Sequence, residues 1–277
     1  MNIGIVGLGL IGGSIAKALR KNTEHVVWGC DSNDSICLQA QVVGAIDDVL
    51  QEDKLALCDL VVIAIYPQDA VEFVKKHRHQ FKKDGIVMDC CGVKRVVCEP
   101  LFALAQECGF NFVGAHPMAG IEFSGFNHSQ NSLFDNASMI MVPSPHTDIA
   151  ITHWVKALLL EIGFTHIQIS TPEEHDEVIA CTSQMAHIVS SAYVKSPTAA
   201  KYKGYSAGSF GDMTRVAKLN PAMWAELFMA NSDNLLVEID GLVARLAAYG
   251  DALRAKNRGE LEALLEDGNR IKIELTK

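Results

Sequence analysis

A histidine between glycines stands out as a candidate for chemistry. His116 lies in the segment Gly114-Ala-His-Pro-Met-Ala-Gly120, directly after the apolar run Phe110 to Val113, which is typical of a strand. Pro117 restricts the residue before it to an extended backbone, so His116 is presented by rigid chain. Glycines on both sides allow a ligand to come close. We therefore predict that His116 is a functional residue at the carboxyl end of a strand.

Two further polar groups occur in the second half of the chain. In Gly208-Ser-Phe-Gly-Asp-Met-Thr-Arg215, Asp212 and Arg215 are three apart and share a helix face. The guanidinium fork of arginine suits planar carboxylates, and the glycines let a ligand approach. His175-Asp176 precedes His187, and the spacing of Asp176 and His187, about three helical turns, predicts that both face the same cleft. No third ligand has suitable spacing, so we expect no metal.

A glycine-rich turn near the first residue predicts a dinucleotide site. The turn Gly7-Leu-Gly-Leu-Ile-Gly12 follows a short apolar strand at 2–6, and a second apolar run at 25–30 ends in Asp31. In such a unit the glycines give a tight turn, close approach of a pyrophosphate, and close packing of helix on strand. The helix that begins near residue 10 directs free N–H groups at the phosphates. The residues expected to bind the cofactor are Gly7, Leu8, Gly9, Leu10, Ile11, Gly12, Asp31, Tyr66 and Pro67.

The acidic residue after the second strand favours NAD over NADP. Asp31 lies where a carboxylate accepts both ribose hydroxyls of NAD and repels a 2′-phosphate. No arginine follows it at positions 32–34. We therefore expect NAD as the cofactor.

The elements around these residues predict a mostly parallel sheet with helices on both faces, an α/β Rossmann-type domain. Strand-like runs occur at 2–6, 25–30, 60–66, 86–90, 111–115, 138–142 and 166–170. Helical patterns occupy 11–21, 33–44, 69–80, 94–108 and 148–162. Ligands of such sheets bind at the carboxyl ends of the strands, where the segments 65–67 and 89–94 fall.

The pattern changes at Thr171, where Thr-Pro-Glu-Glu174 forms a capping box and begins an all-α region. Helices are expected near 172–195, 206–218, 221–256 and 258–275. We predict a dinucleotide-binding domain at 1–170 and a helical substrate and dimerisation domain at 171–277. The apolar positions of the long third helix favour a homodimer interface, with packing inside the chain as the alternative.

Composition narrows the function classes. The 277 residues are 49% hydrophobic and 21% charged, with a net charge of −9, which argues against nucleic acid but leaves an anionic substrate open. No apolar run approaches the ~20 residues that span a bilayer. The first strand begins at Asn2, which leaves no room for a cleavable signal, and we expect a cytoplasmic protein. The eight cysteines form no C-x-x-C pair and are expected to be reduced.

Taken together, these motifs resemble the prephenate dehydrogenase (TyrA) family over nearly the whole chain. The resemblance rests on the glycine turn, on His116-Pro-Met-Ala-Gly-x-Glu122, on His175-Asp176 through His187, and on Asp212-Met-Thr-Arg215 followed by Asn220-Pro-x-x-Trp224. The family combines a Rossmann domain with a helical dimerisation domain. Its reaction is the NAD-dependent oxidative decarboxylation of prephenate to 4-hydroxyphenylpyruvate in tyrosine biosynthesis.

The resemblance implies a role for each residue. His116 would be the base that takes the proton of the ring hydroxyl as hydride leaves that carbon. Arg215 would bind a substrate carboxylate, and His187 would lie in the substrate cleft. Glu122 and Asp212 are further substrate-site candidates, and Asp176 would orient its neighbours.

The chain departs from the family pattern in three places. Gly92 in Asp89-Cys-Cys-Gly-Val-Lys94 replaces a serine that contacts the histidine or the substrate hydroxyl, and water or Cys91 could fill its place. Ile121 stands where a polar residue is frequent, and Gln184 where a histidine is frequent.

Three alternatives remain at this point. The first is an arogenate dehydrogenase, in which Glu122 pairs either with the substrate amine or with Arg215. The second is a β-hydroxyacid-type dehydrogenase with a helical-domain lysine as acid or base, for which Lys195 and Lys218 are available. The third is a silent NAD-binding protein.

Overall fold

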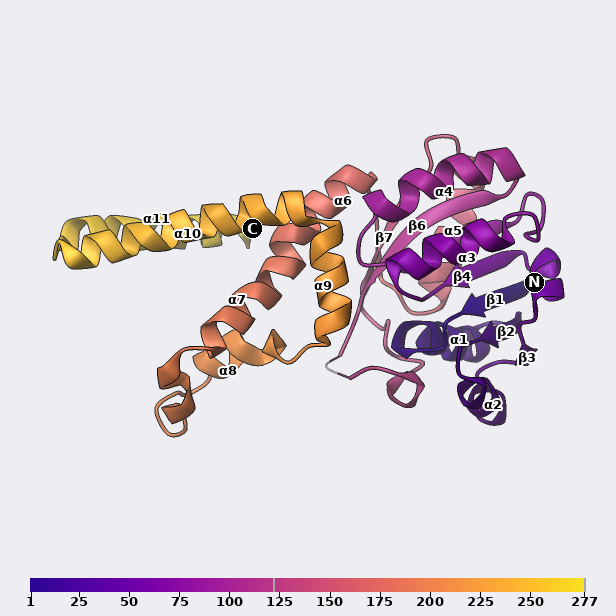
Figure 1. Cartoon of the computed structure of the whole chain (residues 1–277), viewed down its shortest axis with the longest axis horizontal. Helices are drawn as coiled ribbons and strands as arrows, with labels where there is room; N and C mark the ends of the chain where they lie inside the picture. Colours follow the sequence, from indigo (N-terminus) through magenta and orange to yellow (C-terminus); the bar gives the residue numbers. More distant parts are fainter. Residues whose placement is uncertain (122, 277) are drawn as a thin grey trace.

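The computed structural model describes residues 1–121 and 123–276. An α/β region with a single eight-stranded sheet is followed by an all-helical region that extends away from it (Figure 1). The last strand ends at Ile169 and the first helix of the second region begins at Pro172.

The sheet has the strand order β3-β2-β1-β4-β5-β6-β7-β8. Its strands are β1 (Asn2–Val6), β2 (Val26–Cys30), β3 (Asp48–Val49), β4 (Leu60–Ile63), β5 (Ile86–Asp89), β6 (Asn111–Met118), β7 (Ser138–Pro143) and β8 (His166–Ile169). All neighbours are parallel except β6 and β7. The order reverses between β1 and β4, and such a switch point is where open α/β sheets bind dinucleotides.

Helices cover both faces of the sheet, which confirms the predicted Rossmann-type architecture. Apolar side chains of α1 (Leu10–Asn22), α2 (Asp34–Val42) and α5 (Ile149–Glu161) pack into the core on one face. Those of α3 (Pro67–His77) and α4 (Arg95–Cys108) form the core on the other face. Short 3₁₀ turns lie at η1 (Glu52–Leu57) and η2 (Phe126–His128).

Two features of the sheet were not predicted. The two-residue strand β3 is too short to give a sequence pattern. Strand β6 continues to Met118, three residues beyond the expected end, because its second half pairs with the antiparallel β7. His116 therefore lies inside a strand.

The helical region begins with α6 (Pro172–Ile179), which Thr171 caps by accepting a hydrogen bond from the Glu174 backbone at 3.2 Å. It runs through a π-helical turn (Ala180–Gln184) into α7 (Met185–Val194). The remaining elements are η4 (Pro197–Lys201), α8 (Ser209–Thr214), η5 (Arg215–Ala217), α9 (Pro221–Ala230), α10 (Ser232–Arg254) and α11 (Arg258–Leu275).

The prediction of one continuous helix over 221–256 is wrong. The chain breaks at Asn231, which is fully buried and joins α9 to α10. Its side chain bonds the backbone oxygen of Asp176 and the side chain of Gln184, so tertiary contacts hold the corner.

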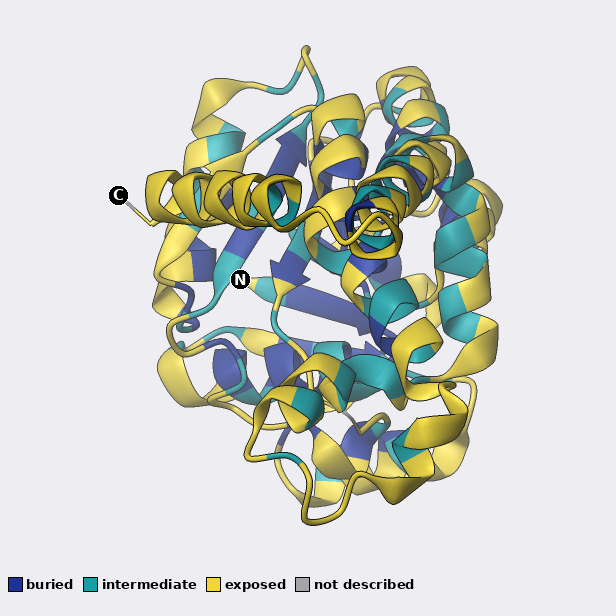
Figure 2. Cartoon of the chain, turned by 90° about the vertical axis from the view of Figure 1, so that its left-hand side faces the viewer, coloured by how far each residue is buried: buried dark blue, intermediate teal, exposed yellow. Residues whose placement is uncertain are grey.

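Helices α10 and α11 project from the body of the protein (Figure 1). Figure 2 shows α11 almost entirely exposed, and none of its residues is buried. Several large apolar side chains on these two helices are at least half exposed, among them Leu236, Val243, Leu246, Leu253 and Leu265. No helix in residues 1–121 and 123–276 is long and apolar enough to cross a membrane. The eight cysteines all fall within these residues and are free thiols.

Candidate active site

The glycine turn has the geometry that each of its glycines was predicted to provide. Gly7 has a φ of +88°, and its N–H donates to the Cys30 carbonyl at 2.8 Å. A Cβ at Gly12 would lie 1.9 Å from the Gly7 carbonyl oxygen, so helix α1 contacts the turn directly. A Cβ at Gly9 would meet nothing within 4 Å, which leaves the α1 N-terminus open to a ligand.

The carboxylate of Asp31 is held against this turn. One oxygen accepts the backbone N–H of Leu8 at 2.9 Å and the other that of Asn33 at 3.0 Å. Tyr66 and Pro67 follow β4, across the switch point, and Tyr66 is 45% exposed. The predicted cofactor residues thus lie along the carboxyl edge of β1, β2 and β4.

His116 lies where β5 and β6 separate. The two strands pair only as far as Met88 and Val113. Beyond that point the Asp89 carboxylate replaces the missing backbone partner by accepting the Ala115 N–H at 3.2 Å. Asp89 also forms an ion pair with Lys94, and both side chains are completely buried. This pair fixes the backbone beside His116.

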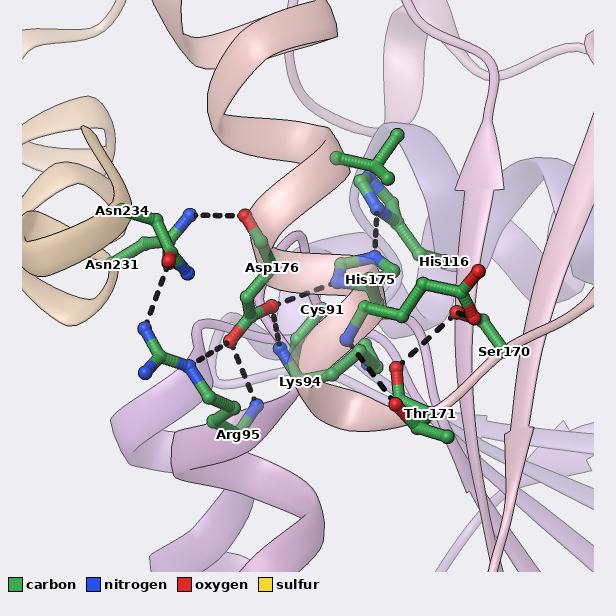
Figure 3. Close-up of polar contacts among 12 residues, drawn as sticks. Cys91, Lys94, Arg95, His116, Ser170, Thr171, His175, Asp176, Asn231 and Asn234 are labelled. Atoms are coloured by element: carbon green, nitrogen blue, oxygen red, sulfur yellow. Dashed lines mark hydrogen bonds and ion pairs between the residues drawn. The ribbon is translucent and has the colours of Figure 1, made fainter. Parts of the chain in front are cut away.

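A chain of three polar side chains starts at His116 (Figure 3). Its Nδ1 lies 2.9 Å from Nε2 of His175, and Nδ1 of His175 lies 2.8 Å from Oδ1 of Asp176. His175 and Asp176 are buried, whereas His116 is partly exposed. The sequence grouped His175 with Asp176 but gave no sign that His175 contacts His116.

The expectation that Asp176 and His187 face one cleft is wrong. Asp176 instead points at the N-terminus of α4, where it accepts the backbone N–H groups of Lys94 at 2.7 Å and Arg95 at 2.9 Å. Arg95 returns a side-chain bond to Asp176 and forms an ion pair with Asp233 of α10. Asp176 thereby connects the sheet region to the helical region.

The π turn between α6 and α7 explains the error. One extra residue in a turn rotates everything after it by about 100° relative to a regular helix. His175 and His187, twelve positions apart, would be about 120° apart in a regular helix and come within about 20° of each other with the insertion. The turn therefore aligns the two histidines and directs Asp176 elsewhere.

The local environment keeps both histidines of the pair neutral. Burial, the neighbouring His175 and the Lys94 ammonium hold the pKa of His116 well below its usual value. Burial also lowers the pKa of His175, although the Asp176 carboxylate opposes the shift. For Asp176 burial raises the pKa, but the bonds from His175 and two backbone N–H groups lower it overall. A neutral imidazole that contacts a second histidine bonded to an ionised carboxylate is a competent proton acceptor.

Helix α9 links His116 to the other predicted substrate residues. A Cβ at Gly92 would lie 3.7 Å from Nε2 of His116 and 3.4 Å from Leu227 of α9. Trp224, one turn earlier on the same face, packs against His187 with ring centroids 3.7 Å apart and the ring planes tilted by 37°. His187 places Nδ1 3.1 Å from the Val216 carbonyl, and burial together with nearby Arg215 lowers its pKa.

Asp212 and Arg215 border a cavity of about 420 Å³ between η5, α7, α8 and α10. Met185 and Val189 line its apolar side, and Glu238 and Arg245 line its α10 side. Sequence reasoning missed Arg245, because only the fold brings α10 beside α8. It also missed the buried Lys94 and Asn231. The one sequence signal for each is a charged or polar residue within an otherwise apolar stretch.

Glu122 lies outside the described residues. Next to it, Phe123 is 53% exposed, and its ring centre is 6.0 Å from the Lys218 ammonium in the segment before α9. Within the described part of the chain, no group of three His, Cys, Asp or Glu residues is arranged to hold a metal ion. Gln184 bonds the Leu227 carbonyl at 3.3 Å and is buried, so it supports α9.

Comparison with known proteins agrees with this geometry. A family model described as the nucleotide-binding domain of prephenate dehydrogenase matches residues 15–168, and one described as its dimerization domain matches residues 171–267. The chain is 31% identical to prephenate dehydrogenase of Bacillus subtilis over 245 residues, which make up 85% of this chain. They cover 66%, just under two thirds, of the B. subtilis protein.

Two solved structures share the whole fold. Prephenate dehydrogenase from A. aeolicus, in complex with hydroxyphenyl propionate and NAD⁺, has a TM-score of 0.86 and 30% identity, with 99% of this chain and 98% of that chain covered. Synechocystis arogenate dehydrogenase has a TM-score of 0.85 and 25% identity, with 99% of this chain and 100% of that chain covered. The chain belongs to the prephenate dehydrogenase family.

Proposed function

We propose that this protein catalyses the NAD-dependent oxidative decarboxylation of prephenate to 4-hydroxyphenylpyruvate. The observation that carries the proposal is the position of the His116 imidazole at the carboxyl edge of a nucleotide-binding sheet, in contact with His175 and with a pKa held well below its usual value by burial. A Cβ on Gly92 would lie 3.7 Å from Nε2 of His116 and 3.4 Å from Leu227 of α9. Trp224 of the same helix contacts His187, which lies near Arg215.

The residues around the switch point fit a dinucleotide without a 2′-phosphate. Gly9 leaves the α1 N-terminus clear, and the Asp31 carboxylate is already oriented by the Leu8 and Asn33 N–H groups. When bound, NAD would supply the hydride acceptor. We infer that Gly7 to Gly12 hold its pyrophosphate, Asp31 its ribose, and Tyr66 with Pro67 the opposite side.

In this proposal the protein positions the substrate and removes one proton. His116 accepts the proton of the ring hydroxyl at Nε2 as the carbonyl forms. Arg215 binds a carboxylate through its donor fork. His187, whose Nδ1–H donates to the Val216 carbonyl, presents a lone pair at Nε2 to the substrate. Loss of CO₂ follows because it makes the ring aromatic, so the protein needs no further acid.

Arogenate is the second candidate substrate. It carries an amino group in addition to a carboxylate, and the cavity beside Arg215 also has the carboxylates of Asp212 and Glu238 on its lining. The lysines that the β-hydroxyacid alternative requires are less suitable, because Lys195 and Lys218 are both exposed.

We further propose that residues 1–170 form the cofactor domain, and that residues 171–277 form the domain through which two copies associate. The exposed apolar side chains of α10 and α11 support association, because Val243, Leu246 and Leu253 are each about 60% exposed on a single long helix. Light scattering on the purified protein should give twice the chain mass. A monomer at micromolar concentration would contradict the proposed dimer.

The deciding experiment measures NADH production with prephenate and arogenate, each with NAD and with NADP. The proposal expects turnover of prephenate with NAD. His116→Asn should abolish turnover while NAD binding, measured by fluorescence, stays near the original value. Arg215→Ala should mainly raise KM. A preference for arogenate would make arogenate, and not prephenate, the proposed substrate. Activity retained in His116→Asn would overturn the assignment of His116 as the base.

A further inference from the structure

We propose that His175, held by Asp176, is the positioning residue that turns His116 into a base. It fixes the tautomer of His116 and shares the positive charge that His116 acquires. The inference rests on the proposed function for the source of the proton, but the state of the imidazole pair is a property of the protein alone.

The hydrogen bonds determine the tautomers in sequence. An ionised Asp176 only accepts, so the contact at 2.8 Å requires a proton on Nδ1 of His175. Neutral His175 then has a lone pair on Nε2. The contact at 2.9 Å requires His116 to donate from Nδ1, which leaves its own lone pair on Nε2. The opposite tautomer of His116 would present an N–H to the substrate and could not accept its proton.

Nε2 of His116 lies beside Gly92, which has no side chain. Nε2 lies 3.7 Å from the place that a Cβ on Gly92 would occupy, and Gly92 leaves that space without a side chain. The two rings are tilted by 56°, with centroids 5.1 Å apart, which fits an N–H to lone-pair bond and does not fit stacking. The substrate side and the relay side of His116 are thus separate nitrogens.

The second role of His175 is to share the positive charge that proton transfer creates. When His116 takes the substrate proton at Nε2, the pair has three N–H protons and one positive charge. That charge can stay on His116, or the Nδ1 proton can move to Nε2 of His175, where the imidazolium contacts Asp176. The other charged groups facing the pair are Lys94, which opposes the charge, and Asp89, which favours it on His175. Asp89 is paired with Lys94, and Arg95 is shared between Asp176 and Asp233, so Asp176 is the carboxylate in direct contact with the imidazole pair.

The pair is anchored by contacts that substitution of His175 does not remove. Asp176 accepts two backbone N–H groups and a bond from Arg95, and Asn231 donates to its backbone oxygen. A variant at position 175 therefore leaves the carboxylate in place (Figure 3).

The first test is independent of substrate. Nitrogen-15 NMR of histidine-labelled protein at pH 7.5 should show His116 protonated on Nδ1 and not on Nε2, with the signals assigned by loss in His116→Asn. In His175→Leu the Nδ1 preference should disappear. A His116 that is protonated on Nε2 in the unmodified protein would overturn the inference.

The second test uses two variants of His175 that differ in their ability to accept the hydrogen bond from His116. The side-chain oxygen of His175→Gln can accept from His116 but cannot carry a proton, whereas His175→Leu can do neither. We expect kcat to fall about 10-fold in the glutamine variant and at least about 100-fold in the leucine variant, with KM little changed. The acid limb of kcat/KM should move to lower pH in His175→Gln, because the pair has lost one site for its proton.

His77→Gln is the matched control. His77 is also buried, and its Nδ1 contacts Gln80 at 2.5 Å, but it lies at the end of α3 away from the cofactor turn. Its pH profile should equal that of the original protein. An unmoved acid limb in His175→Gln would leave His175 a structural residue. If the unmodified protein turns over neither prephenate nor arogenate, the proposed function fails, and the NMR result still decides the tautomer.

Discussion

The Asp176 carboxylate accepts the backbone N–H of Lys94 at 2.7 Å, a contact between residues 82 positions apart. One residue earlier, His175 contacts the candidate base, and the Lys94 side chain holds Asp89 beside that base. The helical region therefore completes the sheet-edge site through the contact of Asp176 with the Lys94 backbone and that of His175 with His116, which no motif in either half reveals.

The free energy of unfolding should decrease as the pH falls below the usual pKa of histidine. The pKa values of His116, His175 and His187 are all lowered in the folded protein, so the unfolded chain binds more protons than the folded one below about pH 6.5. Their contribution is fully present above that pH and is lost as the pH falls toward the folded-state values. Urea unfolding at pH 7.5, 6.5 and 5.5 measures it. The decline should be smaller in His116→Asn, and an equal decline would contradict the shift at His116.

Two glycines of the same turn should respond differently to alanine. Gly12→Ala places a methyl group 1.9 Å from the Gly7 carbonyl oxygen. It should lower the free energy of unfolding by at least about 1–3 kcal/mol. Gly9→Ala meets nothing in the protein and should keep its melting temperature, while NAD binds at least about 10-fold more weakly because the methyl group stands where the pyrophosphate approaches. Calorimetry of melting and of NAD binding separates the two. Unchanged NAD affinity in Gly9→Ala would show that this turn does not bind the cofactor.

The buried ion pair should be costly to break. Lys94→Met leaves the Asp89 carboxylate without its partner in a completely buried position, and we expect a loss of about 3–5 kcal/mol in unfolding free energy. Lys82→Met removes the partner of Asp59 at an exposed ion pair and should cost at most about 1 kcal/mol. Equal effects of the two substitutions in urea unfolding would show that Lys94 does not stabilise the β5–β6 edge.

A serine at position 92 should reach the candidate base. Both Gly92→Ala and Gly92→Ser fit, because the nearest atoms to a new Cβ are 3.4 Å or more away. The serine hydroxyl can donate to Nε2 of His116, which stabilises the neutral imidazole and lowers its pKa further. The acid limb of kcat/KM should therefore move to lower pH in Gly92→Ser and not in Gly92→Ala. The same profile in both variants would place Nε2 out of reach of position 92.

Much of the molecule follows from local patterns. Features that depend on contacts within a few residues, or on one strand–turn–helix unit, can be predicted from residue spacing alone. They are the glycine turn, Asp31, the alternating strands and helices, and the capping residue Thr171. The break at Asn231 and the extension of β6 cannot be predicted in this way, because each depends on a partner far along the chain. Local patterns predicted a continuous helix over 221–256 and a strand that ends at residue 115, and tertiary contacts override both.

For the site, the sequence by itself determined which side chains are available: His116, His175, Asp176, His187 and Arg215 are in the chain whatever its fold. Only the tertiary structure decided their pairing. A period of 3.6 residues directs Asp176 and His187 to one side, whereas the π turn rotates them apart and aligns His187 with His175, which contacts His116. The reason is physical: the buried Gln184, the last residue of the wide turn, bonds to the Leu227 carbonyl and to Asn231, which also bonds to the Asp176 carbonyl, and these partners lie far along the chain.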